Sequence, residues 1–449
     1  MIMEKISLIN PNWGYIDGGI FNRIWPPLCL AVSAALLEEK GFNVEIIDAN
    51  ALRLTPSEAA QMVEKSDKIF ITTSSLDIWQ CPHLNLDYVR ELIDIIKKIN
   101  KNSKVFLLGA HGTIQPIWCF KEINPDYIIQ SEPEKTILKI CEGADPEQTP
   151  SVTYFKDGKL VINELDIPLS LDEFPVPAFH LLPMDRYYYE IMGDKFTLLE
   201  ASRGCPHNCI FCLKKMYCGY RTKSSENIIS EIDYVVKEFN VKNIYFIDLE
   251  FTINRKLVLD VCNHLIEKNF NLKWTCQTRA DSVNEDLLRL MKKAGCIIIH
   301  YGIETGSKKI MEKSNKNITL SQIKQGIYLS QKSGIQTAGF FMFGFPKETK
   351  EDMAETIEYA IQLNPTYASF RILAPHPGTQ IYSQVDLDET FPFNLPEHDF
   401  NILRKMVKKA TLKFYLRPGY MLSRLLYGNP TLWKKQITLF YRYITSKYP

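Results

Sequence analysis

The sequence predicts an α/β fold: an N-terminal doubly wound, Rossmann-like parallel sheet, then a partial (β/α)6 barrel and a helical C-terminal tail. Two observations predict it. Short apolar runs alternate with helical segments, which is typical of parallel sheets covered by helices. The alternation also occurs twice, and the composition shifts to Lys, Arg and aromatics after Asn401. We expect one domain at 1–145, a linker at 146–192, the barrel domain at 193–395 and the tail at 396–449.

The N-terminal series begins with Lys5–Asn10 (KISLIN), an apolar strand pattern. A helix follows over Pro27–Lys40, because Pro opens it and Gly41 closes it. A second helix carries apolar residues at the spacing i, i+3, i+4, i+7. Its stripe is Val89, Leu92, Ile93 and Ile96. The remaining predicted strands are Phe42–Asp48, Lys68–Thr73, Lys104–Leu108 and Tyr127–Gln130.

The segment 143–194 is rich in Pro, Asp and Glu, and predicts a linker with one hairpin at the Lys-Asp-Gly turn of 156–158. The second series then predicts six strands separated by helices. One of these helices places Ile228, Ile232, Val235, Val236 and Phe239 on a single face. The six strands are Thr197–Ser202, Asn243–Asp248, Lys273–Thr278, Cys296–Ile303, Gln336–Phe343 and Tyr367–Leu373. In such a barrel the chemistry lies at the C-terminal ends of the strands.

Composition restricts the class of protein. The chain has 449 residues, 45% of them hydrophobic, which is ample for globular domains and argues against disorder. The formal net charge of +1 argues against a nucleic-acid partner recruited by bulk charge. The N-terminus lacks a secretory pattern, and the apolar run Trp25–Leu37 is too short to span a bilayer. Eleven cysteines without an export signal indicate reduced thiols, so we expect a cytoplasmic protein.

Three cysteines form the most informative motif. Cys205, Cys209 and Cys212 have C-x3-C-x2-C spacing directly after a predicted strand. Three thiolates on one short loop suit a soft metal and leave a fourth coordination position without a protein ligand, as a cluster that binds a substrate at iron requires. The alternative is a zinc knuckle, for which His207 and Cys218 are available as a fourth ligand.

With Phe211 before the last cysteine, this motif resembles that of the radical S-adenosylmethionine (SAM) superfamily. Further segments fit the same family in order. They are Asp248-Leu-Glu-Phe-Thr, Gln277-Thr-Arg279-Ala-Asp, Tyr301-Gly-Ile-Glu304-Thr-Gly, Phe343-Gly-Phe-Pro-Lys-Glu-Thr349 and Pro375-His-Pro-Gly-Thr379. The resemblance implies that the three cysteines hold three irons of a [4Fe–4S] cluster and that SAM chelates the fourth iron.

The resemblance also implies SAM contacts. We expect Phe211, Glu250, Gln277, Arg279 and Glu304 to contact SAM, with Glu250 or Glu304 holding its amino group or ribose hydroxyls. Two of these have structural alternatives: Glu304 as a charge at a helix N-terminus, and Arg279 as one partner of an ion pair. The other cysteines of this half, Cys218, Cys262, Cys276 and Cys296, are expected to be core or surface thiols.

The N-terminal series resembles the cobalamin-binding domain that precedes the radical SAM domain in one large subfamily. Leu108-Gly-Ala-His-Gly-Thr113 ends a parallel strand, where an open sheet binds its ligand and glycines allow close approach. The cobalamin contacts expected here and at neighbouring strand ends are Thr73, Ser74, Gly109, His111, Gly112, Thr113 and Glu132. Better-known cobalamin folds carry a cobalt-ligating histidine after the first strand. The first histidine here is His83, so we expect cobalt to receive no histidine ligand from this chain.

The resemblance therefore implies a cobalamin-dependent radical SAM enzyme, most simply a C-methyltransferase acting on an unactivated carbon through a 5′-deoxyadenosyl radical and methylcobalamin. It names no catalytic residue. A non-methylating cyclase, isomerase or dehydratase is the rival among enzymes, and a cluster-bearing binding or electron-transfer module is the rival from another class. The expected partners are an organic substrate, such as a lipid or natural-product intermediate, and an electron donor such as flavodoxin or ferredoxin.

Residues 401–449 contain eleven Lys or Arg, nine aromatics and no acidic residue. Ile402, Leu403, Met406, Val407, Ala410 and Phe414 follow helical spacing, and a second stripe runs from Leu432 to Ile444. One interpretation is a pair of helices docked on the barrel with basic faces in water. The other is an interfacial element that meets anionic lipid at the inner membrane surface, which would fit a lipid or isoprenoid substrate.

Overall fold

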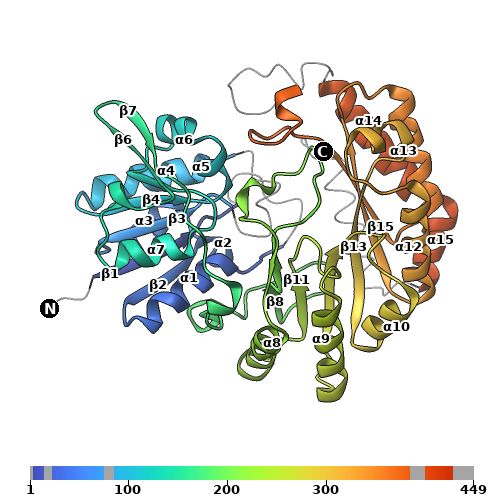
Figure 1. Ribbon diagram of the computed structural model, residues 1–449, viewed down its shortest axis with the longest axis horizontal. Coiled ribbons are helices and arrows are strands. Elements are labelled where there is room, and N and C mark those ends of the chain that lie inside the picture. The colour runs from blue at the N-terminus through green and yellow to red at the C-terminus, as the bar shows by residue number, and fades with distance from the viewer. Residues whose placement is uncertain (1–3, 15–22, 75–84, 385–399, 428–449) are drawn as a thin grey trace. The chain divides into compact units, whose positions relative to one another are not determined.

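A computed structural model of the protein describes residues 4–14, 23–74, 85–384 and 400–427. The chain divides into two compact units, one of Met1–Cys205 with Leu213–Ile247 and the other of Pro206–Cys212 with Asp248–Pro449. Unit 1 contains a seven-stranded sheet in the order β2-β1-β3-β4-β5-β6-β7 (Figure 1). Its strands are β1 (Lys5–Asn10), β2 (Asn43–Asp48), β3 (Lys68–Thr72), β4 (Lys104–Leu108), β5 (Tyr127–Ile129), β6 (Val152–Lys156) and β7 (Lys159–Ile162). The first five are parallel, as predicted.

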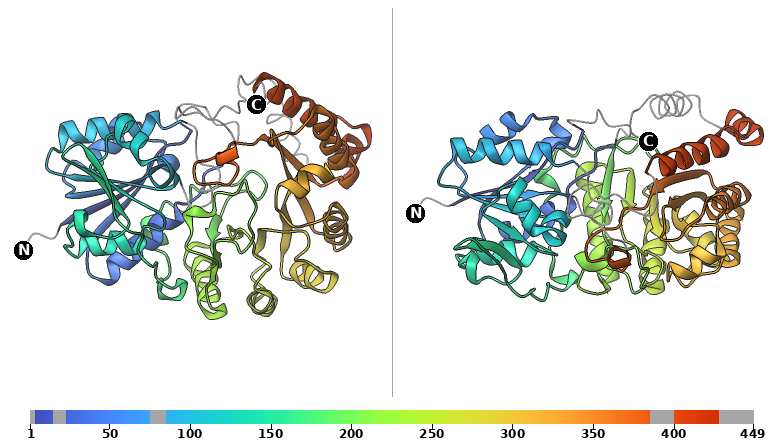
Figure 2. Two further views of the ribbon diagram at one scale, coloured as in Figure 1. Left: turned by 45° about the horizontal axis from the view of Figure 1, so that its top comes forward. Right: turned by 90° about the horizontal axis from the view of Figure 1, so that it is seen from above.

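Helices cover both faces of this sheet (Figure 2). On one face, α1 (Leu28–Glu39) and α7 (Glu134–Cys141) pack on alternate strand residues such as Leu8 and Phe106. On the other face lie α3 (Pro56–Met62), α4 (Asp87–Ile99) and α6 (Pro116–Glu122). The predicted stripe of α4 is fully buried there. Apolar side chains on both sides of each strand therefore produce the doubly wound fold. Two short helices, α2 (Ala49–Leu52) and α5 (Ala110–Ile114), follow β2 and β4.

The predicted hairpin exists and extends this sheet. β6 pairs antiparallel with β5 and with β7, and the turn at Asp157-Gly158 has positive φ at both residues, as tight hairpins require. The expected linker 146–192 therefore starts with two ordered strands of the first sheet. The linker pattern misleads here because an edge hairpin is half exposed and carries turn residues, so its composition resembles that of a loop.

The second series contains all six predicted strands. In unit 1, β8 (Phe196–Leu199) pairs in parallel with β11 (Asn243–Phe246). In unit 2, β12 (Lys273–Thr278), β13 (Cys296–Glu304), β14 (Gln336–Phe343) and β15 (Tyr367–Ile372) are parallel neighbours in that order. The first predicted strand is broken at Glu200-Ala201. It resumes as β9 (Ser202–Arg203), antiparallel to β10 (Arg221–Thr222).

The helices between these strands carry clear start and stop signals. They are α8 (Ser225–Phe239), α9 (Arg255–Lys268), α10 (Glu285–Lys293), α11 (Lys308–Lys313), α12 (Leu320–Lys332) and α13 (Lys350–Leu363). Ser224 and Thr349 accept a hydrogen bond from a first-turn amide, the usual N-cap arrangement. Asn240, Asn269 and Asn364 end helices in the left-handed conformation that Asn tolerates. These connections are short and ordered, which fixes the strand ends that carry the site.

The tail begins with α14 (Phe400–Tyr415) and α15 (Pro418–Tyr427), and α14 lies against α13 and β15 (Figure 1). Its buried residues are Leu403, Val407, Ala410 and Phe414, and Lys405, Lys408 and Lys409 are exposed. α14 is therefore docked on the barrel, as the first interpretation of the tail expects. The second predicted stripe, 432–444, lies outside the described residues. None of the described helices is long and apolar enough to cross a membrane.

Candidate functional site

The cysteine loop leaves β9 and is anchored by residues distant in sequence. The Ile210 amide donates to the Ser314 carbonyl (3.0 Å), and the Ile381 amide donates to the Ile210 carbonyl (3.0 Å). Phe211 packs edge-to-face on Phe345, with 5.7 Å between ring centroids. Cys205, Cys209 and Cys212 are each partly exposed on this loop. The backbone and Phe211 thus hold the loop, and the thiols remain accessible.

Within the described parts of the chain, no three His, Cys, Asp or Glu side chains converge as a preformed metal site. The donor set nevertheless fits an iron–sulfur cluster, since three partly exposed thiols on one loop are soft ligands that leave a fourth position open. Cys218, the candidate fourth zinc ligand, is exposed. Of the cysteines expected to be core or surface thiols, Cys262, Cys276 and Cys296 are buried in the core. Burial raises the pKa of Cys276 well above its usual value, which disfavours the thiolate that a metal needs.

Charged residues from three strand ends and from the loop after α11 lie near Cys209. Burial raises the pKa of its thiol, and the nearby cations Lys316 and Arg279 act in the opposite direction. Two carboxylates, Glu250 and Glu304, lie close enough to raise that pKa further. The structure therefore brings the two predicted carboxylates and Arg279 to the neighbourhood of one cysteine.

Glu304 ends β13 and is bound to a residue that sequence reasoning missed. Its Oε1 lies 2.8 Å from the Nζ of Lys316, and both side chains are at least nine-tenths buried. Burial lowers and the Glu304 carboxylate raises the pKa of Lys316, with a net rise that keeps the ammonium charged. Glu304 itself has φ +71° and lies outside any helix, since α11 starts at Lys308. The alternative of a helix-terminal charge is therefore wrong.

Glu250 follows β11 and is 7% exposed. Its Oε2 accepts hydrogen bonds from the Arg279 amide (2.8 Å) and the Thr278 hydroxyl (3.3 Å). Burial raises the pKa of this carboxyl to about 7, although Lys316 and these hydrogen bonds lower it. Gln277 is partly exposed, and its carbonyl accepts from the Phe251 amide. Glu250 is thus a buried carboxyl close to the end of β11, held in place by the backbone and side chain of β12 and the residue after it.

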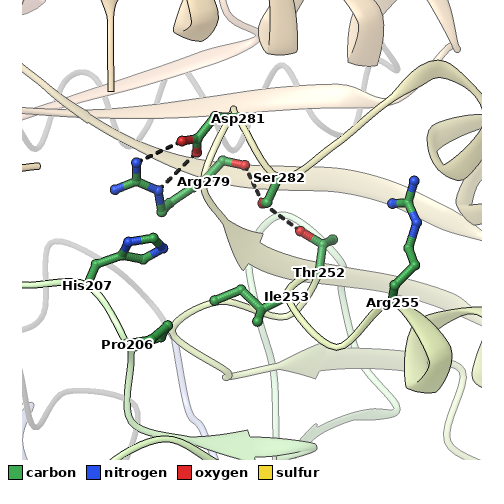
Figure 3. A pocket seen from close by; sticks show the side chains of 8 residues that line it. All are labelled: Pro206, His207, Thr252, Ile253, Arg255, Arg279, Asp281 and Ser282. Atoms are coloured by element: carbon green, nitrogen blue, oxygen red, sulfur yellow. Dashed lines mark hydrogen bonds and ion pairs between the residues drawn. The ribbon is translucent and has the colours of Figure 1, made fainter. Parts of the chain in front are cut away.

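Arg279 forms an ion pair with Asp281, which is the structural alternative to a SAM contact. Its guanidinium binds both oxygens of Asp281 (2.9 and 2.8 Å) and donates to the carbonyls of Lys316 and Asn317. It also lines a cavity of about 440 Å³ beside the start of the cysteine loop (Figure 3). The other lining residues are Pro206, His207, Thr252, Ile253, Arg255, Asp281 and Ser282. Arg279 therefore fixes the segment that contains Lys316, and its ion pair faces this cavity.

Sequence reasoning missed Lys316 and the hydroxyls of Thr252 and Ser282. The two hydroxyls lie 2.7 Å apart (Figure 3). The Thr252 hydroxyl also lies 2.6 Å from the Thr278 hydroxyl. Lys316 follows a short helix in a polar run, Ser314-Asn-Lys-Asn, which resembles an ordinary surface loop. The sequence signal available for it was an unpaired buried carboxylate at a strand end, because Glu304 needs a cation when it is buried.

The predicted cobalamin residues gather at the strand ends of β3, β4 and β5 in unit 1. Gly109 has φ +99°, and a Cβ there would lie 2.9 Å from the hydroxyls of both Thr73 and Ser74. A Cβ at Gly112 would lie 2.5 Å from a methyl of Ile128. His111 is fully buried. The two glycines are therefore required by the packing of the α5 turn itself, because a side chain at either position would collide with its neighbours.

Two other predicted cobalamin residues are engaged by protein groups. The Thr113 hydroxyl accepts from the Ser131 amide (2.9 Å). Both oxygens of Glu132 are used: Oε2 binds Arg203, and Oε1 binds Arg221 and the Cys218 amide. Glu132 thus belongs to an ion network.

Fold and site together define a class of protein. A doubly wound domain with a glycine-lined strand edge precedes a series of βα units that carries a three-cysteine loop with carboxylates nearby, as in enzymes that combine a corrin cofactor with a SAM-binding iron–sulfur cluster. The comparisons agree. Residues 18–140 match the B12 binding domain family, and residues 199–360 match the Radical SAM superfamily.

The most informative relatives match nearly the whole chain. The chain is 31% identical to an uncharacterized methyltransferase of Pyrococcus horikoshii, over 94% of this chain and 95% of that protein. It is 29% identical to the anaerobic magnesium-protoporphyrin IX monomethyl ester cyclase of Rubrivivax gelatinosus, over 87% of this chain and 71% of that one. The solved structure of the cobalamin-dependent SAM radical enzyme OxsB with aqua-cobalamin has the same fold. It matches with a TM-score of 0.74 and 17% identity, over 98% of this chain and 72% of that one.

This chain belongs to the radical SAM superfamily, to the group that carries a cobalamin-binding domain. It is a radical SAM enzyme, and its cofactors are a [4Fe–4S] cluster, SAM and cobalamin. Such an enzyme acts on an organic substrate and needs a reductant.

Proposed function

We propose that the protein transfers a methyl group to an unactivated carbon of an organic substrate. The observation that carries this proposal is the combination, in one chain, of a three-cysteine loop beside Glu250 and Glu304 with a glycine-lined strand edge of the B12-binding type. The relative named as a methyltransferase, 31% identical over almost the whole chain, supports the choice of methyl transfer.

In this proposal Cys205, Cys209 and Cys212 hold the cluster irons, and Glu250 or Glu304 receives the amino group or ribose of SAM. Bound together, the cofactors supply hydrogen abstraction and the methyl group. Glu250 suits an amino group because one of its oxygens is already committed to the backbone, which fixes the direction of the other. Lys316 orients Glu304 and suits a carboxylate of the ligand. Phe211, Gln277 and Arg279 complete the surroundings, Arg279 by holding the backbone of Lys316.

In the N-terminal domain Thr73, Ser74, Gly109, His111, Gly112 and Thr113 form the edge that a corrin ring would approach. The Ser74 hydroxyl already accepts from the Ala110 amide (3.0 Å), and Thr73 donates to the Leu108 carbonyl (2.9 Å). These bonds fix the turn, so the edge is preorganised. The proposed functional limits are 1–145 for this domain, 146–192 for a linker whose first part forms the hairpin β6–β7 of the same sheet, 193–395 for the radical SAM domain and 396–449 for the tail.

One experiment separates the proposed function from its rivals. The reconstituted enzyme is incubated anaerobically with SAM, hydroxocobalamin, a reductant and candidate substrates, and the nucleoside products are quantified. Methyl transfer by this route yields 5′-deoxyadenosine and S-adenosylhomocysteine in parallel. 5′-Deoxyadenosine alone would favour a non-methylating reaction. The relative named as a cyclase is the reason to test for this outcome. Absence of both would favour a binding or electron-transfer module.

The identities of the electron donor, the substrate and the membrane contact are also proposals. A small acidic electron carrier such as flavodoxin or ferredoxin would supply the electron. A lipid or natural-product intermediate would be the substrate, with no nucleic acid involved. Contact of 401–449 with the inner membrane surface would bring a lipid substrate within reach. Exposed Lys405, Lys408 and Lys409, with Leu416, Met421 and Leu422 exposed nearby, support this peripheral contact.

A further inference from the structure

A buried arginine stands two residues before the first cysteine of the metal loop. The Arg203 side chain is fully buried and meets three carboxylates of unit 1. Its Nη1 lies 2.8 Å from Glu132, its Nη2 lies 2.7 Å from Glu134 and its Nε lies 2.9 Å from Glu200. Because a guanidinium donates in fixed directions, three simultaneous contacts fix its position closely.

Two of these carboxylates come from the segment that follows β5, Ser131–Glu134, and the same segment reaches the far end of the cysteine loop. The Ser131 hydroxyl donates to the Met216 carbonyl (3.0 Å). Glu132 accepts from the Cys218 amide (3.1 Å) and pairs with Arg221. Ser131–Glu134 therefore contacts residues both before Cys205 and after Cys212.

The two ends of the cysteine loop also close on one another. Arg203 and Arg221 are opposite partners of β9 and β10. Gly204 has φ +78°, and a Cβ there would lie 1.9 Å from the Gly219 carbonyl oxygen. The base of the loop is thus narrow, and Ser131–Glu134 holds both of its sides.

We propose that Ser131, Glu132 and Glu134 are positioning residues for the cluster loop. The two carboxylates hold it through Arg203, Ser131 holds it through the Met216 carbonyl, and neither carboxylate contacts the corrin. In this network Arg203 and Arg221 balance carboxylates that would otherwise be buried without partners. A neutral residue at 132 would leave Arg203 with two of its three carboxylates and would remove the charge that Arg221 and the Cys218 amide bind, so both sides of the loop would be held less firmly. The cysteines would then be less well held for iron.

The test uses the full chain and measures each cofactor separately, so its outcome does not depend on the reaction proposed above. Glu132→Gln and Arg203→Lys are compared with wild type and with Glu147→Gln, a matched control whose partner Lys156 is exposed. Each protein is reconstituted with iron and sulfide alone, and iron content, the electron paramagnetic resonance spectrum of the reduced cluster and its midpoint potential are measured. Each is also loaded with hydroxocobalamin alone and gel-filtered.

We expect Glu132→Gln and Arg203→Lys to retain iron about 10-fold less well, or to shift the spectrum and potential, because outer partners of metal ligands have effects of that order. Their retention of cobalamin should equal that of wild type, and Glu147→Gln should match wild type throughout. A Glu132→Gln variant that loses cobalamin and keeps a wild-type cluster would overturn the proposal.

If those variants fail to fold, Ser131→Ala provides the test instead. It removes one hydroxyl and no buried charge, so it should fold. The proposal requires an altered cluster spectrum or potential in Ser131→Ala at an unchanged melting temperature. A wild-type spectrum, potential and iron content in that folded variant would contradict it.

Discussion

The chemistry of Cys209 depends on residues 41 to 107 positions away in the chain. The ends of β11, β12 and β13 bring Glu250, Arg279 and Glu304 to it, and the loop after α11 brings Lys316. Burial makes the neutral thiol the stable form, and a metal that binds thiolate reverses that preference. We therefore expect Cys209 to lose its proton when iron binds and to remain a neutral thiol without it. The thiols of Cys262, Cys276 and Cys296 are buried, so we expect them neither to bind metal nor to react.

Replacing Cys209 tests this directly. Cys209→Ala removes one of three thiolates, so we expect loss of the brown cluster colour and of SAM cleavage, with two ligands too few to retain the cluster. The measurement is iron content and the visible spectrum after anaerobic reconstitution. Cys262→Ala, a buried core thiol in α9, serves as control and should keep the cluster. Full activity of Cys209→Ala would contradict the assignment of the site.

The coordination of cobalt is a second property of single residues. No histidine precedes His83 in the sequence, and His111 is fully buried in the α5 turn. We therefore expect the electron paramagnetic resonance spectrum of the bound Co(II) form to lack nitrogen splitting from a protein imidazole. His111→Gln should leave that spectrum unchanged. Splitting that disappears in His111→Gln would show that this histidine ligates cobalt.

Single residues also show where sequence reasoning stops. The three cysteines and both carboxylates were predictable because their spacing or their place after a strand is local information. Lys316 was not, since its role arises from a contact with Glu304 across 12 residues of loop and helix. Glu132 was predicted at the right strand end, but its partners Arg203 and Arg221 lie 71 and 89 residues away. Pairing between distant charges leaves no local pattern.

Among the elements, the turn between β14 and α13 contains a buried titratable carboxyl, that of Glu348. Glu348 is 4% exposed, and its Oε2 accepts from the amides of Gly344 (2.5 Å) and Phe345 (3.1 Å). Its Oε1 is buried with no hydrogen-bond partner among the described residues. Burial raises the pKa of this carboxyl to about 7, although the two amides lower it. Phe345 in turn packs on Phe211 of the cysteine loop.

This raised pKa predicts a pH-dependent stability. A carboxyl whose pKa is higher in the folded state stabilises most below its unfolded value, near 4.3, and that contribution is lost as pH rises through about 7. Between pH 5.5 and 8.5 we expect wild type to lose about 2 kcal/mol of unfolding free energy relative to Glu348→Gln. Urea unfolding of both proteins at the two pH values measures this. A difference independent of pH would show that Glu348 titrates normally.

The elements themselves were largely predictable. β1, β4, β12 and β14 have the predicted bounds, because their apolar runs are bounded by charged or turn residues. The strand predicted at Thr197–Ser202 instead breaks at Glu200, whose carboxyl binds Arg203. Periodicity gives no warning of such a break, since β9 turns to pair with β10 from 18 residues downstream. Tertiary pairing decided that boundary.

At the scale of the whole molecule, the tail both packs on the barrel and carries the basic residues proposed to meet a membrane. α14 buries Leu403 and Phe414 against its neighbours, and the Tyr415 hydroxyl exchanges hydrogen bonds with the backbone of Ala368. Removing the whole tail would therefore expose β15, and a truncation at residue 400 would confuse membrane binding with misfolding. A truncation after Tyr427 keeps both described tail helices and removes four of the eleven cations.

That shorter truncation and a charge variant give the sharpest test of peripheral membrane contact. The charge variant replaces Lys405, Lys408 and Lys409, all exposed on α14, with Gln. Each cation near an anionic surface contributes about 1 kcal/mol, roughly 5-fold in affinity, so each variant should sediment far less with phosphatidylglycerol vesicles at low salt. Wild type with phosphatidylcholine vesicles is the control and should remain in the supernatant. Because the attraction is electrostatic, added salt should release wild type as well. Binding that ignores salt and lipid charge, or that survives in both variants, would mean that the basic face of the tail serves only to keep a docked helix in water.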